Sequence, residues 1–165
     1  MSHTIDYYYD FSSPYAYLAC EEVTKIAERN GATVNHIPFL LGGLFRLVEL
    51  DMSNGPPIMQ ASENKQRHLS EDMARYADLR GLPFAWPPTF PLNTVRPLRV
   101  MLQLSGEQHR SLAIRIFKAY WGEGAEIADP TVLGALITEE GLDAEALLAG
   151  CQDPAVKAKL IENTT

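Results

Sequence analysis

The sequence predicts an α/β fold in which a strand–helix–strand unit comes first and a large all-helical block follows. Three observations predict it. Residues 4–10 contain an aromatic run with strand propensity, residues 14–29 repeat apolar side chains at helical spacing, and residues 33–39 alternate as a strand does. The periodic segments after residue 40 are all helical. A strand, a helix and a strand in this order form a β-α-β unit with a right-handed crossover.

The junction between the first strand and the first helix suggests a binding site. A run of three tyrosines ends at Tyr9, and Ser12, Ser13 and Pro14 follow directly. Serine is a preferred N-cap and proline a preferred first helical residue, so the helix begins at this point. Unpaired N–H groups and the positive end of the helix dipole suit an anion or a thiolate there. Ser13, at the tip, can donate a hydrogen bond to such a ligand.

The first helix ends at Asn30-Gly31, a typical C-cap, and the second strand would turn Val34, Ile37 and Phe39 to the core. Residues 40–46 are then predicted as an apolar loop with two glycines, and residues 51–57 as a turn or loop. A helix is predicted over 61–80. The apolar side chains expected on one side of it are Leu69, Met73, Tyr76 and Leu79.

Residues 81–91 hold four prolines and three aromatic residues, which predicts a rigid apolar wall. Helices are predicted over 94–104, 107–121, 131–140, 143–149 and 155–161. The pairs Asp129-Pro130 and Asp153-Pro154 are strong helix starts, because aspartate caps the N-terminus and proline fits the first position. We therefore expect the chain to divide into a β-α-β unit over residues 1–40, a helical block over 41–128 and a last set of helices over 129–165, which the resemblance described below makes an insertion and a return to the first unit.

Composition excludes several classes of protein. The chain has 165 residues, 46% of them hydrophobic, and a formal charge of −7, which argues against nucleic acid or an anionic membrane as partner. No apolar run is as long as a membrane span, and the N-terminal segment does not have the pattern of a signal peptide. Cys20 and Cys151 lack motif spacing and are expected to be reduced thiols of a cytoplasmic protein. The four histidines show no metal-ligand spacing, so no metal site is expected.

The pattern Asp10-Phe11-x-Ser13-Pro14-Tyr15-x-Tyr17-Leu18 resembles the opening motif of the 2-hydroxychromene-2-carboxylate isomerases and the kappa-class glutathione transferases. Both are glutathione-using, thioredoxin-like proteins close to the DsbA type of thiol oxidoreductase. The oxidoreductases carry Cys-x-x-Cys where this chain has Ser-Pro-Tyr-Ala over residues 13–16. Without either sulfur, thiol–disulfide exchange at this turn is excluded. The resemblance continues through residues 38–45, 55–57, 121–124 and 129–130, and so covers nearly the whole chain.

The resemblance implies a thioredoxin-like fold of the DsbA/kappa type, with a large all-helical insertion. In the family a Gly-Val-Pro-Thr strand, a further strand and a last helix come next, whereas this sequence ends at Thr165. We therefore expect the C-terminal ββα part of the fold to be missing from this chain, as in a truncated sequence.

The resemblance also places the family's catalytic serine at Ser13. Its role would be to donate a hydrogen bond to a glutathione thiolate; the alternative is a simple helix cap. Such a bond contributes about 1.5–3 kcal/mol and a helix N-terminus about 0.3–1 kcal/mol, which together lower a thiol pKa by about one to three units. Ser12 is the rival hydroxyl. No Gly-x-Ser-x-Gly turn surrounds Ser13 and no His–Asp pair can be assigned to it, so it is not a serine-protease nucleophile.

Further site residues follow from the resemblance, each with a plainer alternative. Asn54 and Lys65 would contact glutathione, although Lys65 matches the family only with a two-residue insertion; otherwise they are a turn former and a solvated charge. One of three arginines would bind the substrate's carboxylate, the candidates being Arg46, Arg96 and Arg99.

Among the aromatic residues, Trp86 and Phe90 of the proline-rich loop would either stack on an aromatic substrate or belong to the core. Tyr120 and Trp121 are expected in the core.

The implied function is glutathione-dependent interconversion of 2-hydroxychromene-2-carboxylate and trans-o-hydroxybenzylidenepyruvate, or of a related aromatic carboxylate. The alternatives are a kappa-type glutathione S-transferase and a non-catalytic thioredoxin-like binding protein. The family pattern further implies a homodimer. It is the resemblance, and not the periodicity of the sequence, that carries these expectations.

Overall fold

The computed structural model describes residues 3–165. It contains two strands and nine helices over this range. In chain order they are β1 (His3–Tyr9), α1 (Pro14–Arg29), β2 (Ala32–Pro38), α2 (Leu41–Leu47), α3 (Pro57–Gln60), α4 (Glu63–Leu79), α5 (Val95–Met101), α6 (Gly106–Trp121), α7 (Pro130–Glu139), α8 (Ala144–Gly150) and α9 (Pro154–Thr164).

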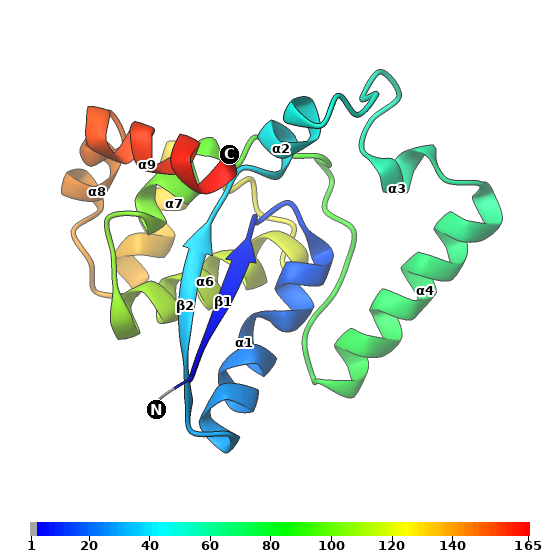
Figure 1. Cartoon of the computed structure of the whole chain (residues 1–165), viewed down its shortest axis with the longest axis horizontal. Helices are drawn as coiled ribbons and strands as arrows, with labels where there is room; N and C mark the ends of the chain where they lie inside the picture. The colour runs from blue at the N-terminus through cyan, green and yellow to red at the C-terminus, as the bar shows by residue number, and fades with distance from the viewer. Residues whose placement is uncertain (1–2) are drawn as a thin grey trace.

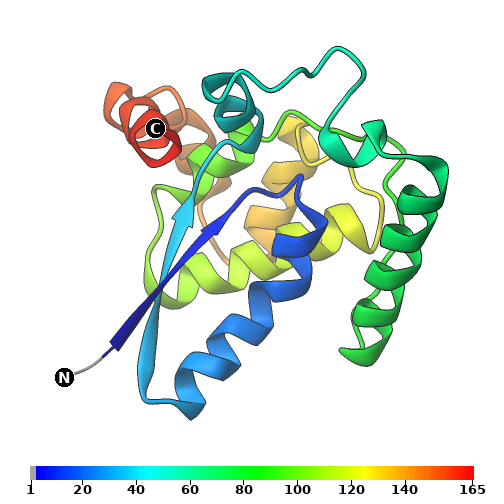
Figure 2. The same ribbon diagram turned by 45° about the vertical axis from the view of Figure 1, so that its right-hand side comes forward.

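The two strands form a parallel pair, as the β-α-β unit predicts, with His3 opposite Ala32 and Tyr9 opposite Pro38. Tyr7 and Tyr9 alternate with Tyr8, so the first two point to the covered face of the sheet and Tyr8 is 54% exposed on the other. Helices α1 and α6 pack together on the covered face. Figures 1 and 2 show α4 at one side of the molecule, beyond α1, and α8 and α9 at the other.

An aromatic cluster forms the centre of the core, where β1, α1 and α6 meet. The rings of Tyr9, Phe11 and Phe117 lie within 5.8 Å of one another, centroid to centroid. Trp121, at the end of α6, is fully buried and its indole N–H donates to the carbonyl oxygen of Phe11 over 2.8 Å. This hydrogen bond links the C-terminal end of α6 to the turn that precedes α1. Trp121 and Tyr120 are thus core residues, as the sequence predicts.

The loop prediction for residues 40–46 is wrong, because Leu41–Leu47 is the helix α2. Glycine disfavours a helix by about 1 kcal/mol relative to alanine, and two glycines in seven residues obscured the pattern. Tertiary contacts compensate: the N–H of Leu41 donates to the carboxylate of Asp10, and the N–H of Leu40 to the hydroxyl of Thr164.

The apolar side predicted for α4 is only half correct. Met73 is buried, whereas Tyr76 is 47% exposed and Leu79 is 79% exposed. Helix α4 packs on the rest of the molecule along a narrow seam against α1, and Ala77 takes the second buried position. Leu69 is half-buried against the core, so Tyr76 and Leu79 are the two side chains of the predicted set that face solvent.

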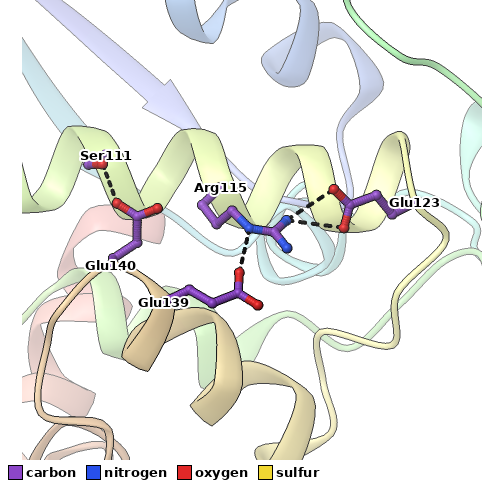
Figure 3. Close-up of polar contacts among 5 residues, drawn as sticks. All are labelled: Ser111, Arg115, Glu123, Glu139 and Glu140. Carbon is purple, nitrogen blue, oxygen red and sulfur yellow. Dashed lines mark hydrogen bonds and ion pairs between the residues drawn. The ribbon is translucent and has the colours of Figure 1, made fainter.

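A polar cluster joins α6 to α7 at the surface, as Figure 3 shows. The Arg115 guanidinium donates to Glu139 over 2.8 Å and to Glu123 over 3.1 Å. One turn earlier on α6, the hydroxyl of Ser111 donates to Glu140. Arg115 therefore ties together α6, α7 and the loop that follows α6.

Candidate functional site

Two serine hydroxyls stand at the turn before α1, and their hydrogen bonds differ. Ser13 is the N-cap, with extended backbone angles, and its Oγ accepts from the N–H of Ala16 over 3.3 Å. Because an accepting hydroxyl still has its own proton, Ser13 can donate to a ligand. The hydroxyl of Ser12 donates to Oδ1 of Asp10 over 3.2 Å, so the Ser12 hydroxyl has no proton left to donate to a ligand.

Ser13 lines a cavity of about 690 Å³. Its walls are the turn before α1, helix α2, side chains from the segment 52–69 and residues 90–95; those of the segment are Met52, Pro56, Pro57, Ile58, Ala61, Lys65 and Leu69. The volume lies in the range of small-molecule sites, about 300–1,000 Å³. Most of the wall is apolar, including Leu41, Phe45 and Phe90. The hydroxyl is therefore accessible from a pocket large enough for a ligand.

Two cationic side chains, Arg46 of α2 and Lys65 of α4, also line this cavity. Both residues are exposed, and within residues 3–165 neither takes part in an ion pair. Together with the N-terminus of the 16-residue helix α1 they bring positive charge to the cavity, whose one acidic lining residue among those described is Asp10. The arrangement suits a ligand with one or more carboxylates.

Asp10 is an acidic residue of the cavity that the sequence analysis did not single out. It is fully buried, and its carboxylate accepts hydrogen bonds from the backbone and hydroxyl of Ser12, the hydroxyl of Thr94 and the N–H of Leu41. Burial raises the pKa of the Asp10 carboxyl, and these hydrogen bonds act in the opposite direction. The sequence placed Asp10 directly after the first strand and at the head of the family motif, but neither signal gave the residue a role of its own.

Of the residues predicted for the site, the structure brings together Ser13, Arg46, Lys65 and Phe90. It does not bring Asn54, Trp86 or Arg96 to the same cavity, and the reasons differ. Asn54 lies in an exposed loop, where its amide donates to its neighbour Ser53. Trp86 packs with its ring edge against Trp121, and Arg96 donates to the carbonyl oxygen of Ala128 instead.

The chain supplies no reactive sulfur to this cavity. Cys20 and Cys151 are free, buried and absent from its walls. Burial raises the pKa of the Cys20 thiol to about 12, so it stays protonated at neutral pH. In the part of the chain that the structure describes, no three side chains of His, Cys, Asp or Glu gather as a metal site requires. Nor is any helix there long and apolar enough to cross a bilayer.

A parallel β-α-β unit whose first turn presents a polar side chain at a helix N-terminus, followed by a block of helices, is the arrangement that thioredoxin-like proteins of the DsbA type share. The serine at that turn sets this chain apart from the thiol oxidoreductases. The chain belongs to the DSBA-like thioredoxin domain family, whose model matches residues 4–165.

Two relatives show what the chain is similar to. The 2-hydroxychromene-2-carboxylate isomerase of Pseudomonas putida is 30% identical over 138 residues, which cover 82% of this chain and 64% of the relative. Glutathione S-transferase kappa 1 of Caenorhabditis elegans is 31% identical over 123 residues, covering 71% of this chain and 51% of the relative. The chain thus spans about two thirds and one half of these two proteins.

Two solved structures resemble the fold. A 2-hydroxychromene-2-carboxylate isomerase superposes with a TM-score of 0.83 at 25% identity, over 98% of this chain and 77% of the other. The cytosolic disulfide reductase DsbM from Pseudomonas aeruginosa, in a structure with GSH, superposes with a TM-score of 0.63 at 25% identity, over 97% and 77% of the two chains.

Proposed function

We propose that this protein is a glutathione-dependent isomerase that interconverts 2-hydroxychromene-2-carboxylate and trans-o-hydroxybenzylidenepyruvate, or a closely related aromatic carboxylate. One observation carries the proposal: a serine hydroxyl with a proton to donate, at a helix N-terminus, inside a cavity of about 690 Å³ that two cationic side chains also line. The similarity to the isomerases supports it.

Glutathione fits the cavity by its chemistry. The hemiketal ring of the chromene would first open at its ring C–O bond, with the hydroxyl proton passing to the phenol oxygen, to give the cis open-chain ketone. Glutathione would supply a thiolate that adds to a conjugated carbon of this ketone, and the thiolate would leave again, restoring the double bond, after rotation about the former double bond. The chain lacks a thiolate of its own there, and the cavity offers a hydroxyl donor and cations for carboxylates. The DsbM structure with GSH adds support from a related fold.

Five residues of the cavity then have a role in the proposed reaction. Ser13 donates its proton to the sulfur and so lowers the pKa of the glutathione thiol. Lys65 pairs with a carboxylate of glutathione, and Arg46 with the carboxylate of the substrate. Phe90 and Phe45 supply the apolar wall for an aromatic ring and keep water from it. We infer that the enzyme works as a homodimer in the cytoplasm, where glutathione is reduced.

The test is an assay of purified protein with 2-hydroxychromene-2-carboxylate, with and without glutathione, followed by chromatography of the products. The isomerase proposal requires the trans product and a strict need for glutathione. A glutathione conjugate as the final product would instead identify a kappa-type transferase, which the Caenorhabditis elegans relative makes the second candidate. If calorimetry detects no glutathione binding, both proposals fail and a non-catalytic binding protein remains.

A further inference from the structure

Asp10 holds together three segments that are far apart in the sequence. Its Oδ1 accepts from the N–H of Ser12 at 2.9 Å and from the hydroxyl of Thr94 at 2.7 Å, while its Oδ2 accepts from the N–H of Leu41 at 2.8 Å. These donors belong to the turn before α1, the start of α2 and the residue before α5. Each of the three segments contributes to the walls of the cavity that Ser13 lines.

Both side chains at the centre of this junction are buried. Asp10 is 0% exposed and Thr94 is 1% exposed. The carbonyl oxygen of Asp10 also accepts from the N–H of Ser13 over 2.9 Å, so the backbone of the proposed catalytic residue is fixed by the same residue. A buried carboxylate with several donors has a strongly preferred geometry, because the loss of any donor leaves charge without compensation.

We propose that Asp10 is the positioning residue of this site: its carboxylate sets where Ser13 and the start of α1 stand relative to the sulfur of bound glutathione. The inference rests on the proposed use of glutathione. It assigns to Asp10 no contact with the reacting atoms, and its effect passes through Ser12, Leu41 and Thr94.

The direction in which Asp10→Asn changes the pKa of the bound thiol distinguishes a positioning role of Asp10 from a direct electrostatic effect of its charge. A negative charge near the cavity disfavours a thiolate, so neutralising Asp10 would by that effect alone lower the pKa of the bound thiol. Loss of the positioning role would instead raise the pKa of the bound thiol, because the hydroxyl of Ser13 would no longer be placed to donate to the sulfur. A raised thiol pKa in Asp10→Asn therefore reports geometry and cannot come from the removed charge.

The Asp10→Asn variant keeps the size of the side chain but mismatches the hydrogen bonds. Donors converge on both carboxylate oxygens, so in either orientation the amide NH₂ of asparagine faces another donor. Asp6→Asn is the matched control, on strand β1, which ends directly before Asp10. Asp6 is exposed, on the face of β1 that also carries Tyr8, and accepts from the side chain of Asn35.

Two readouts test the proposal on the full chain. Hydrogen exchange needs no ligand: the amides of Ser12 and Leu41 should exchange at least about tenfold faster in Asp10→Asn than in the wild type and in Asp6→Asn. Ultraviolet titration of the thiolate should show a raised pKa for bound glutathione in Asp10→Asn, with affinity at least about tenfold weaker by calorimetry. Wild-type exchange rates and thiol pKa in Asp10→Asn would overturn the inference.

If Asp10→Asn does not fold, two milder substitutions at Thr94 test the positioning role. Thr94→Val removes the hydroxyl with little change of shape and leaves the charge of Asp10 in place, whereas Thr94→Ser keeps the hydroxyl. We expect a raised thiol pKa and faster exchange at Leu41 in the valine variant, and wild-type values in the serine variant. Equal behaviour of the two variants would refute the positioning role. A wild-type protein without glutathione binding would refute the proposed function instead, and the exchange rates would still decide whether Asp10 organises the cavity.

Discussion

Replacing Ser13 by alanine tests the proposed chemistry most directly, and the structure gives the size of two separate effects. The first is on stability. The Oγ of Ser13 caps α1 through a bond of 3.3 Å from Ala16, which is long for a hydrogen bond. Its loss should therefore cost about 0.5–1 kcal/mol, the lower part of the usual range for a cap. The variant should fold, with a slightly lower melting temperature.

The second effect is on the bound thiol. A hydrogen bond to a charged group contributes about 1.5–3 kcal/mol, and one pKa unit corresponds to about 1.36 kcal/mol. Ser13→Ala should therefore raise the pKa of bound glutathione by about one to two units. Turnover at neutral pH should fall by at most about 10- to 100-fold and recover as the pH rises, because the thiolate fraction is then restored.

The assay is ultraviolet titration of the thiolate on the glutathione complex, combined with the pH profile of isomerisation. Asp143→Ala is the matched control, since Asp143 caps α8 through the N–H of Ala146 over 3.0 Å and lies outside the walls of the cavity. It should lose comparable stability and keep the thiol pKa and turnover of the wild type. If Ser13→Ala also keeps both, the serine is only a helix cap and the reasoning is refuted.

Three other predictions follow from contacts in the structure. Burial, His109 and Arg110 lower the pKa of His36 to about 4, so as the pH falls the unfolded chain gains a proton on this side chain before the folded chain does. The free energy of unfolding should therefore fall as the pH drops from about 6.5 to about 4. Urea titrations of His36→Gln should show a flatter dependence of the free energy of unfolding on pH. The KM for substrate should rise about tenfold in Arg46→Met, and the KM for glutathione about tenfold in Lys65→Met. Both KM values should stay unchanged in Arg96→Met, because the Arg96 guanidinium binds the carbonyl oxygen of Ala128 outside the cavity. Steady-state kinetics measures these values, and an equal effect of the three substitutions would contradict the prediction. Arg115→Met should lower stability by about 0.5–1 kcal/mol in urea unfolding, and by less in 1 M salt, since its partners are largely exposed.

Local signals in the sequence predicted most of the elements. The Ser-Pro and Asp-Pro helix starts are local chemistry, and the structure has helices beginning at Pro14, Pro130 and Pro154. Helix α2 escaped prediction because its stability comes from outside: the partners of Leu40 and Leu41 lie 124 and 31 residues away. No pattern within seven residues contains that information.

The same argument applies to the candidate site. Ser13 could be identified from the turn in which it stands, because the cap and the helix start are adjacent in sequence. Asp10 could not, since its importance depends on Thr94, which is 84 residues away in the sequence. For Trp86 the sequence left two alternatives, a ligand contact or a place in the core; in the structure its ring lies against Trp121, and it is not in the wall of the cavity.

The packing of Trp86 has a practical consequence for ligand studies. The chain has two tryptophans, and their ring centroids are 5.6 Å apart at an interplanar angle of 73°. Two indoles at this distance couple electronically, which gives a signature in near-ultraviolet circular dichroism. Phe90, which lines the cavity, is 5.2 Å from the Trp86 ring. Because Phe90 contacts both the cavity and the indole pair, we expect a ligand that displaces Phe90 to change the near-ultraviolet circular dichroism of the unlabelled protein.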